Sequence, residues 1–166
     1  MTEYPFDTVR AIDNMLLTGQ RAQYPDIKMI FAHGSGAIPY LAAPIAGMAS
    51  LLWLGGLSVP ESLAQLAGYY FDTAASTSAI QLITLKSFVG ADQITDHKWA
   101  VPVTSPKLCS CSILTHADPY VPVSQASSGL SAIEDNGTFT TVVMGQINNL
   151  NALKIFPRII NALKLD

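Results

Sequence analysis

The sequence predicts an α/β fold built from parallel βα units. Segments with the three- and four-residue apolar spacing of helices alternate with short, continuous apolar runs, and only a few residues connect them. Strands that are apolar on both faces are typical of parallel sheets covered by helices. At 166 residues the chain fits one domain, and residues 1–166 are therefore taken as a single unit.

The first half of the chain carries four predicted elements. They are a helix from Tyr4 that stops at Gly19, a strand over residues 27–32, a helix over residues 38–52, and a short helix from Pro60.

Two further elements follow before the pattern ends. A strand is predicted over residues 68–73, and a helix over residues 76–88 with Ile80, Ile83 and Leu85 on its inner side. Beyond Ile94 neither period is visible, and helical spacing returns only at residues 124–134 and 142–156.

The composition excludes several classes of protein. Hydrophobic residues make up 49% of the chain, which excludes a disordered polypeptide, and the net charge of −3 argues against binding nucleic acid through its phosphates. Two cysteines cannot form a disulfide-rich scaffold. Charged residues are only 13% of the total, about half of the ~25% usual in soluble domains, so a large face is expected to be covered or the chain to be incomplete.

We expect a cytoplasmic protein without a membrane span. The N-terminus has neither a basic nor an apolar leader segment, so no signal peptide is predicted. Residues 38–57 are apolar and long enough to cross a bilayer, but prolines and glycines interrupt them and no basic cluster flanks them. A buried helix and loop is the preferred interpretation.

His33 is the main candidate for chemistry. It closes a predicted strand and precedes Gly34-Ser35-Gly36, whose glycines allow close backbone approach, and Asp72 stands at the end of the next predicted strand. A single histidine can equally be structural. The oxyanion loop of an α/β-hydrolase is disfavoured, because no serine lies in a Gly-x-Ser-x-Gly elbow.

A zinc cluster is the second candidate site. Cys109 and Cys111 are followed by His116 and Asp118, but the spacing matches no common zinc motif, and free cysteines in an irregular loop are the simpler interpretation. The chain also has no His-x-His, His-Glu-x-x-His or Walker A motif.

Several motifs occur in an order that resembles a known enzyme family. They are YPFDT at residues 4–8, YPDIK at 24–28, FAHGSGAIPYL at 31–41, YYFDTA at 69–74 and FVGADQI at 88–94. The chain resembles the C-terminal half of the amidohydrolase superfamily, in particular the aminocarboxymuconate-semialdehyde decarboxylase-like proteins that include γ-resorcylate and 6-methylsalicylate decarboxylases. The resemblance covers about three quarters of the chain.

This resemblance implies the fold and the site. It implies the C-terminal part of a TIM (β/α)8-like barrel and a divalent metal, zinc or manganese, that this chain alone would not retain. His33 matches the catalytic histidine of the family, and Asp118 matches its metal-binding aspartate. The first-strand motif and the middle-strand histidine that also bind the metal have no counterpart here, so a truncated barrel is expected.

One stretch departs from the family. Residues 95–115 have no counterpart in it and are expected to be an irregular insertion or a translated intron. Half a barrel would leave sheet edges unpaired and a core face uncovered, in agreement with the low charge.

The resemblance implies a decarboxylase that acts on a small aromatic or unsaturated carboxylic acid, with the fragment inactive alone. A metal-dependent hydrolase, or a non-catalytic remnant that pairs with a full-length relative or with itself as a homo-oligomer, are the alternatives.

Overall fold

A three-stranded parallel sheet organises the chain. The computed structural model describes residues 3–73, 78–95, 137 and 139–158. The sheet has the order β1 (Ile30–Phe31), β2 (Tyr70–Asp72) and β3 (Ile94–Thr95). Phe31 is in register with Phe71, and Asp72 with Thr95. The predicted parallel βα arrangement is confirmed for these residues.

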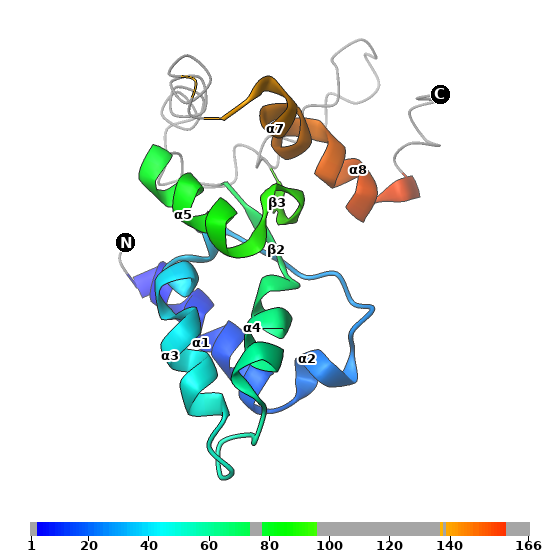
Figure 1. The fold of residues 1–166 in the computed structure, drawn as a ribbon. Helices are drawn as coiled ribbons and strands as arrows, with labels where there is room; N and C mark the ends of the chain where they lie inside the picture. Colours follow the sequence, from blue (N-terminus) through cyan, green and yellow to red (C-terminus); the bar gives the residue numbers. More distant parts are fainter. Residues whose placement is uncertain (1–2, 74–77, 96–136, 138, 159–166) are drawn as a thin grey trace.

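The helices form two groups, which Figure 1 shows below and above the sheet, and both contribute to one core. α1 (Glu3–Leu17), α3 (Ile38–Ala49) and α4 (Val59–Ala67) contact one another, with the short α2 (Gln20–Gln23) beside α1. The upper group in Figure 1 comprises α5 (Ala79–Val89), α7 (Thr141–Gly145) and α8 (Asn151–Ile155), the last two joined by a π-helical turn, η4 (Gln146–Leu150). Two 3-10 turns, η1 (His33–Ser35) and η2 (Ala91–Gln93), complete the described elements.

Local capping explains where two of the helices begin. The hydroxyls of Ser58 and Ser78 accept hydrogen bonds from the N–H groups of Glu61 and Gln81 and so cap α4 and α5. After α1, Gly19 adopts φ 72°, a left-handed conformation that glycine reaches without strain, and the helix ends there as the sequence predicts.

The inner side of α5 differs from the sequence prediction. Leu82 and Leu85 are each 1% exposed and belong to the core, whereas Ile80 is 72% and Ile83 46% exposed. The prediction that Leu85 faces inward is confirmed, and the prediction for the two isoleucines is wrong. Polar residues are distributed around this helix and form no single polar face, so its sequence does not reveal which side is buried.

Substitutions on α5 should reproduce this difference. We expect Leu82→Ala to lower the free energy of unfolding by about 2–5 kcal/mol, because it opens a cavity in the core. Ile80→Gln should change it by less than about 0.5 kcal/mol, because the side chain is already largely in water. Urea titration followed by circular dichroism measures both, and an equal loss in the two variants would contradict the assignment of the buried face.

Other boundaries are shorter than predicted. Only Ile30 and Phe31 of the predicted strand 27–32 pair in the sheet, and the helix expected to residue 52 ends at Ala49. β3 has no counterpart among the predicted elements, because two residues carry too little periodicity to indicate a strand. The residues at 124–134 and 96–115 lie outside the described part of the chain, so the predicted helix and most of the proposed insertion remain predictions.

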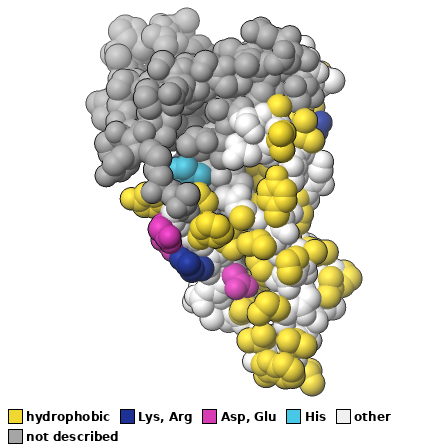
Figure 2. Space-filling view, turned by 90° about the vertical axis from the view of Figure 1, so that its left-hand side faces the viewer, with side chains coloured by type: hydrophobic (Ala, Val, Ile, Leu, Met, Phe, Trp, Pro, Cys, Tyr) yellow, Lys and Arg dark blue, Asp and Glu magenta, His cyan; other side chains and the backbone are white. Residues whose placement is uncertain are grey.

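The loop after α3 is rich in exposed apolar side chains. Leu52 is 91% and Trp53 79% exposed, and Met48 on α3 is also exposed. Figure 2 shows apolar side chains gathered at the lower end of the face it displays, with few charged ones around them. Among the described residues, no helix combines the length and the apolar character needed to cross a bilayer.

The last helix is attached to β3 by a buried amide. Nδ2 of Asn151 donates hydrogen bonds to the carbonyls of Ala91 (2.7 Å) and Ile94 (2.6 Å), and Asn151 is fully buried. One turn later, Nζ of Lys154 lies 3.0 Å from Oδ1 of Asp92 in an exposed ion pair. The helical segment 146–155 therefore packs back onto the sheet.

Candidate functional site

The carboxyl ends of β1 and β2 bring His33 and Asp72 together. The backbone N–H of His33 donates a hydrogen bond of 2.9 Å to Oδ1 of Asp72. The two residues are far apart in the sequence, but neighbouring parallel strands end at the same edge of a sheet, which is where barrel enzymes carry their chemistry. Both side chains are half-buried.

The turn after β1 has an unusual backbone. His33, Gly34, Ser35 and Gly36 have φ angles of 63°, 58°, 61° and 62°. Positive φ is ordinary for glycine, but it costs free energy in histidine and serine, and such strain concentrates at functional sites. The N–H of Ser35 bonds to the carbonyl of Ala32, and that of Gly36 to the carbonyl of His33, which closes the turn on itself.

The other side of this turn is pressed against α1. A Cβ added at Gly36 would lie 2.9 Å from both the carbonyl carbon and Cα of Pro5, and closer still to its oxygen. Ser35 is fully buried, and its hydroxyl donates to the carbonyl of Gly34 at 2.6 Å. The sequence indicates a loop that allows close approach, and the structure identifies α1 as the partner.

The two faces of β2 have different environments. Phe71 is fully buried and packs with Phe31 and Tyr69, whereas Tyr70 and Asp72, which point to the opposite face, are only half-buried. The strand is therefore covered by helices on the Phe71 face and less completely on the Asp72 face. Asp72 and the end of β1 are accessible from that second face.

Arg21 stabilises the buried side of β2 through contacts with Tyr69 and with backbone carbonyls. The guanidinium of Arg21 lies 5.0 Å from the centre of the Tyr69 ring and donates to the carbonyls of Gly68, Pro25 and Ile27. Burial raises the pKa of the Tyr69 hydroxyl, and the positive charge of Arg21 opposes that rise. The group is a structural element and faces away from Asp72.

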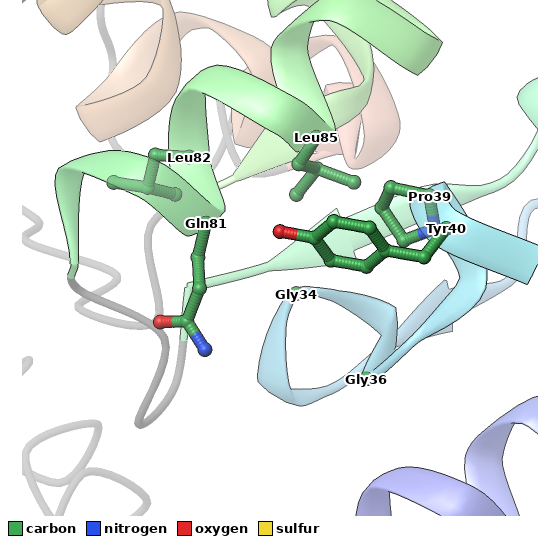
Figure 3. Close-up of a pocket in the computed structure, with 7 residues that line it drawn as sticks. All are labelled: Gly34, Gly36, Pro39, Tyr40, Gln81, Leu82 and Leu85. Atoms are coloured by element: carbon green, nitrogen blue, oxygen red, sulfur yellow. The ribbon is translucent and has the colours of Figure 1, made fainter.

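A small hollow adjoins the glycine turn (Figure 3). Its cavity volume is about 10 Å³, room for roughly one water molecule, and it is lined by Gly34, Gly36, Pro39, Tyr40, Gln81, Leu82 and Leu85. The Tyr40 hydroxyl points across it towards α5, where it lies 3.5 Å from Oγ1 of Thr84. Because its lining has no ionisable group except this phenol, and ligand pockets usually reach ~300–1,000 Å³, the hollow by itself does not form a catalytic site.

The described residues do not provide a metal site. Across residues 3–73, 78–95, 137 and 139–158, no three histidine, cysteine, aspartate or glutamate side chains come together. His33 and Asp72 are two such residues in hydrogen-bond contact. Asp118, predicted as a metal ligand, and the Cys109, Cys111 and His116 of the alternative zinc cluster lie outside the described residues, so both remain predictions.

The fold is that of part of a TIM-barrel decarboxylase. The structure superimposes on 5-carboxyvanillate decarboxylase from Sphingomonas paucimobilis with a TM-score of 0.63 and 19% identity, over 92% of this chain and 40% of that one. A dihydroxybenzoic acid decarboxylase from Polaromonas sp. JS666, solved with bound manganese and the inhibitor 2-nitroresorcinol, gives a TM-score of 0.63 and 18% identity, over 93% and 40%.

Sequence comparison identifies the relatives more specifically. The chain is 35% identical to a 6-methylsalicylic acid decarboxylase of Penicillium expansum over 95 residues, which are 57% of this chain and 29% of the relative. It is 34% identical to a decarboxylase of Aspergillus niger over 74 residues, 45% of this chain and 20% of the relative. No family model matches.

The predicted resemblance is thereby confirmed: the chain is similar to 6-methylsalicylic acid decarboxylases, and its fold is that of part of the solved carboxyvanillate and dihydroxybenzoate decarboxylases. It spans less than a third of the length of the curated relatives that it matches and about 40% of the solved structures.

Proposed function

We propose that this chain forms the His33 side of the active site of a carboxy-lyase that removes carbon dioxide from a small aromatic or unsaturated carboxylic acid. The observation that carries the proposal is the position of His33, at the carboxyl end of β1 beside Asp72, in a chain similar to aromatic-acid decarboxylases. This position matches the usual location of catalytic residues in barrels.

The proposed role of His33 is proton transfer. When the bond to the carboxylate breaks, its electron pair stays on the substrate carbon and carbon dioxide leaves. The carbon then takes a proton, which a protonated imidazole can supply. Histidine suits this task because its unperturbed pKa of about 6.5 lies close to neutral pH, so that both protonation states are accessible.

The proposed role of His33 involves no metal, because the described residues contain no group of side chains that could hold one. A bound manganese in the Polaromonas decarboxylase supports a divalent metal, zinc or manganese, in the complete site. We propose Asp118 as one ligand, with the remaining ligands outside this sequence. The 166 residues alone are then expected to hold no stoichiometric metal and to be inactive.

Two measurements on the isolated chain test that expectation. Elemental analysis after incubation with zinc or manganese should find well below one metal per chain, and 6-methylsalicylate should release no carbon dioxide above the buffer rate. Stoichiometric metal together with turnover would contradict the proposed division of the active site.

A chimera tests the role of His33 directly. Residues 30–95 would replace the aligned segment of the Penicillium expansum decarboxylase, and we expect the chimera to keep decarboxylating 6-methylsalicylate. His33→Ala in the chimera should reduce kcat by about 10²–10⁴-fold, the usual contribution of a positioned acid or base. Glu61→Gln, at an exposed position of α4, is the matched control and should leave kcat unchanged. Equal rates for His33→Ala and its parent chimera would refute the assignment.

A further inference from the structure

The N–H group of His33 bonds to a side chain of the neighbouring strand. The backbone ladder holds β1 to β2 through Tyr70, whose N–H donates to the carbonyl of Met29 at 2.9 Å. Beyond Phe31 the strand pairing ends. At that point the N–H of His33 donates to Oδ1 of Asp72, also at 2.9 Å, so a carboxylate takes the place that a strand carbonyl would occupy.

His33 needs such a partner because its backbone is strained. With φ at 63° it lies in the left-handed region, which is unfavourable for a residue that carries a Cβ. A hydrogen bond from an N–H to an ionised carboxylate is stronger than one between neutral groups. Asp72 is therefore suited to hold this turn in a conformation that His33 would not adopt by itself.

The remainder of the turn is fixed from the opposite side. Gly36 is in close contact with Pro5 of α1, and Ser35 is fully buried. With α1 against one end and Asp72 bonded to the other, the direction of the Cα–Cβ bond of His33 follows from the backbone. The imidazole direction then depends on whether the Asp72 contact is made.

We propose that Asp72 is a positioning residue: its carboxylate holds His33 in the left-handed conformation and so aims the imidazole from the carboxyl edge of the sheet. A catalytic role for this positioning rests on the proposed function. The positioning itself is a property of the free chain and can be measured without substrate or metal.

Nuclear magnetic resonance of the full 166-residue chain tests the proposal. The wild type is compared with Asp72→Ala, which removes the acceptor, and Asp72→Asn, which keeps one acceptor oxygen without the charge. Asp92→Asn is the matched control, because it removes the same charge from the exposed ion pair with Lys154, away from the turn.

The readouts are the Cα and Cβ shifts of His33, which report its backbone conformation, and the hydrogen exchange of its amide. We expect Asp72→Ala to abolish the left-handed shifts and to speed exchange at His33 by about tenfold or more, the effect of losing one hydrogen bond. The amides of Tyr70 and Thr73, which bond to backbone carbonyls of the sheet, should keep their protection. Asp72→Asn should keep the left-handed shifts but exchange faster than the wild type at His33, because a hydrogen bond to a neutral acceptor is weaker. The control should match the wild type.

Each other outcome overturns the proposal. Unchanged His33 shifts in a folded Asp72→Ala variant would show that the turn holds itself. If this variant does not fold, Asp72→Asn decides, and an unaltered exchange rate at His33 would then refute a role for the charge. Unfolding of both variants would show that Asp72 supports the whole sheet and not one turn. If the chimera does not decarboxylate 6-methylsalicylate but Asp72→Ala loses the left-handed shifts of His33, the decarboxylase assignment is rejected and the positioning role of Asp72 is retained.

Discussion

Replacing Gly36 by alanine is expected to lower the free energy of unfolding by about 2–6 kcal/mol. Two costs combine. The backbone at Gly36 has φ 62° and ψ −117°, which is accessible almost only to glycine, and such strain costs about 1–3 kcal/mol. The new methyl group would also collide with the backbone of Pro5, and overpacking against groups that cannot move costs about 1–3 kcal/mol. Urea denaturation followed by circular dichroism measures the sum.

Gly19 provides a matched control for that experiment. Its φ is 72°, but a Cβ added there would meet nothing within 4 Å. Gly19→Ala should therefore cost only the left-handed penalty of about 1–2 kcal/mol. Similar losses at the two positions would mean that α1 does not press on the His33 turn, and the second support of that turn would be lost.

Local chemistry explains which parts of the fold the sequence could predict. The helices predicted from Pro60 and from residue 76 and the stop at Gly19 depend on residues within one turn of the boundary. The structure places the two helix starts within two residues of these predictions, at the caps Ser58 and Ser78. The orientation of α5 is different, because a helix without a single polar face does not show which side is buried. Ile80 and Leu82 are distinguished only by what packs against them.

The candidate site could be predicted in part for the same reason. Polar residues at the ends of two predicted parallel strands, His33 and Asp72, indicated one edge of the sheet, and the structure places them in hydrogen-bond contact. The left-handed backbone of His33 and the contact between Gly36 and Pro5 depend on tertiary packing. The Gly34-Ser35-Gly36 sequence signals an unusual turn without specifying its partner.

The unequal coverage of β2 links the fold to the proposed function. Phe71 is buried by helices, while Tyr70 and Asp72 on the opposite face are half-buried. In a closed barrel that face would be the interior, lined by side chains from all strands. The solved decarboxylases extend well beyond the part that aligns with this chain.

Replacing Asn151 by leucine is expected to lower the free energy of unfolding by about 2–4 kcal/mol. The side-chain amide donates to the carbonyls of Ala91 and Ile94, and a leucine of similar size would leave both without these donors. An unsatisfied buried polar group costs about 1–3 kcal/mol. The Asn151 oxygen is itself buried without a partner among the described residues. Because the substitution removes this oxygen as well, part of the lost stability is recovered. Thermal and urea unfolding measure the difference.

Lys154→Ala separates this buried contact from the ion pair one turn away. Lys154 and Asp92 are both largely exposed, and exposed pairs contribute about 0–1 kcal/mol. A loss at Asn151 at least twice that at Lys154 would show that the amide holds α8 to β3. If Asn151→Leu were neutral, the C-terminal helices would not be integral to the sheet, and hydrogen exchange at β3 should then be unaffected by the substitution. In the expected case, protection of β3 falls together with global stability, because the sheet edge and the last helix unfold as one unit.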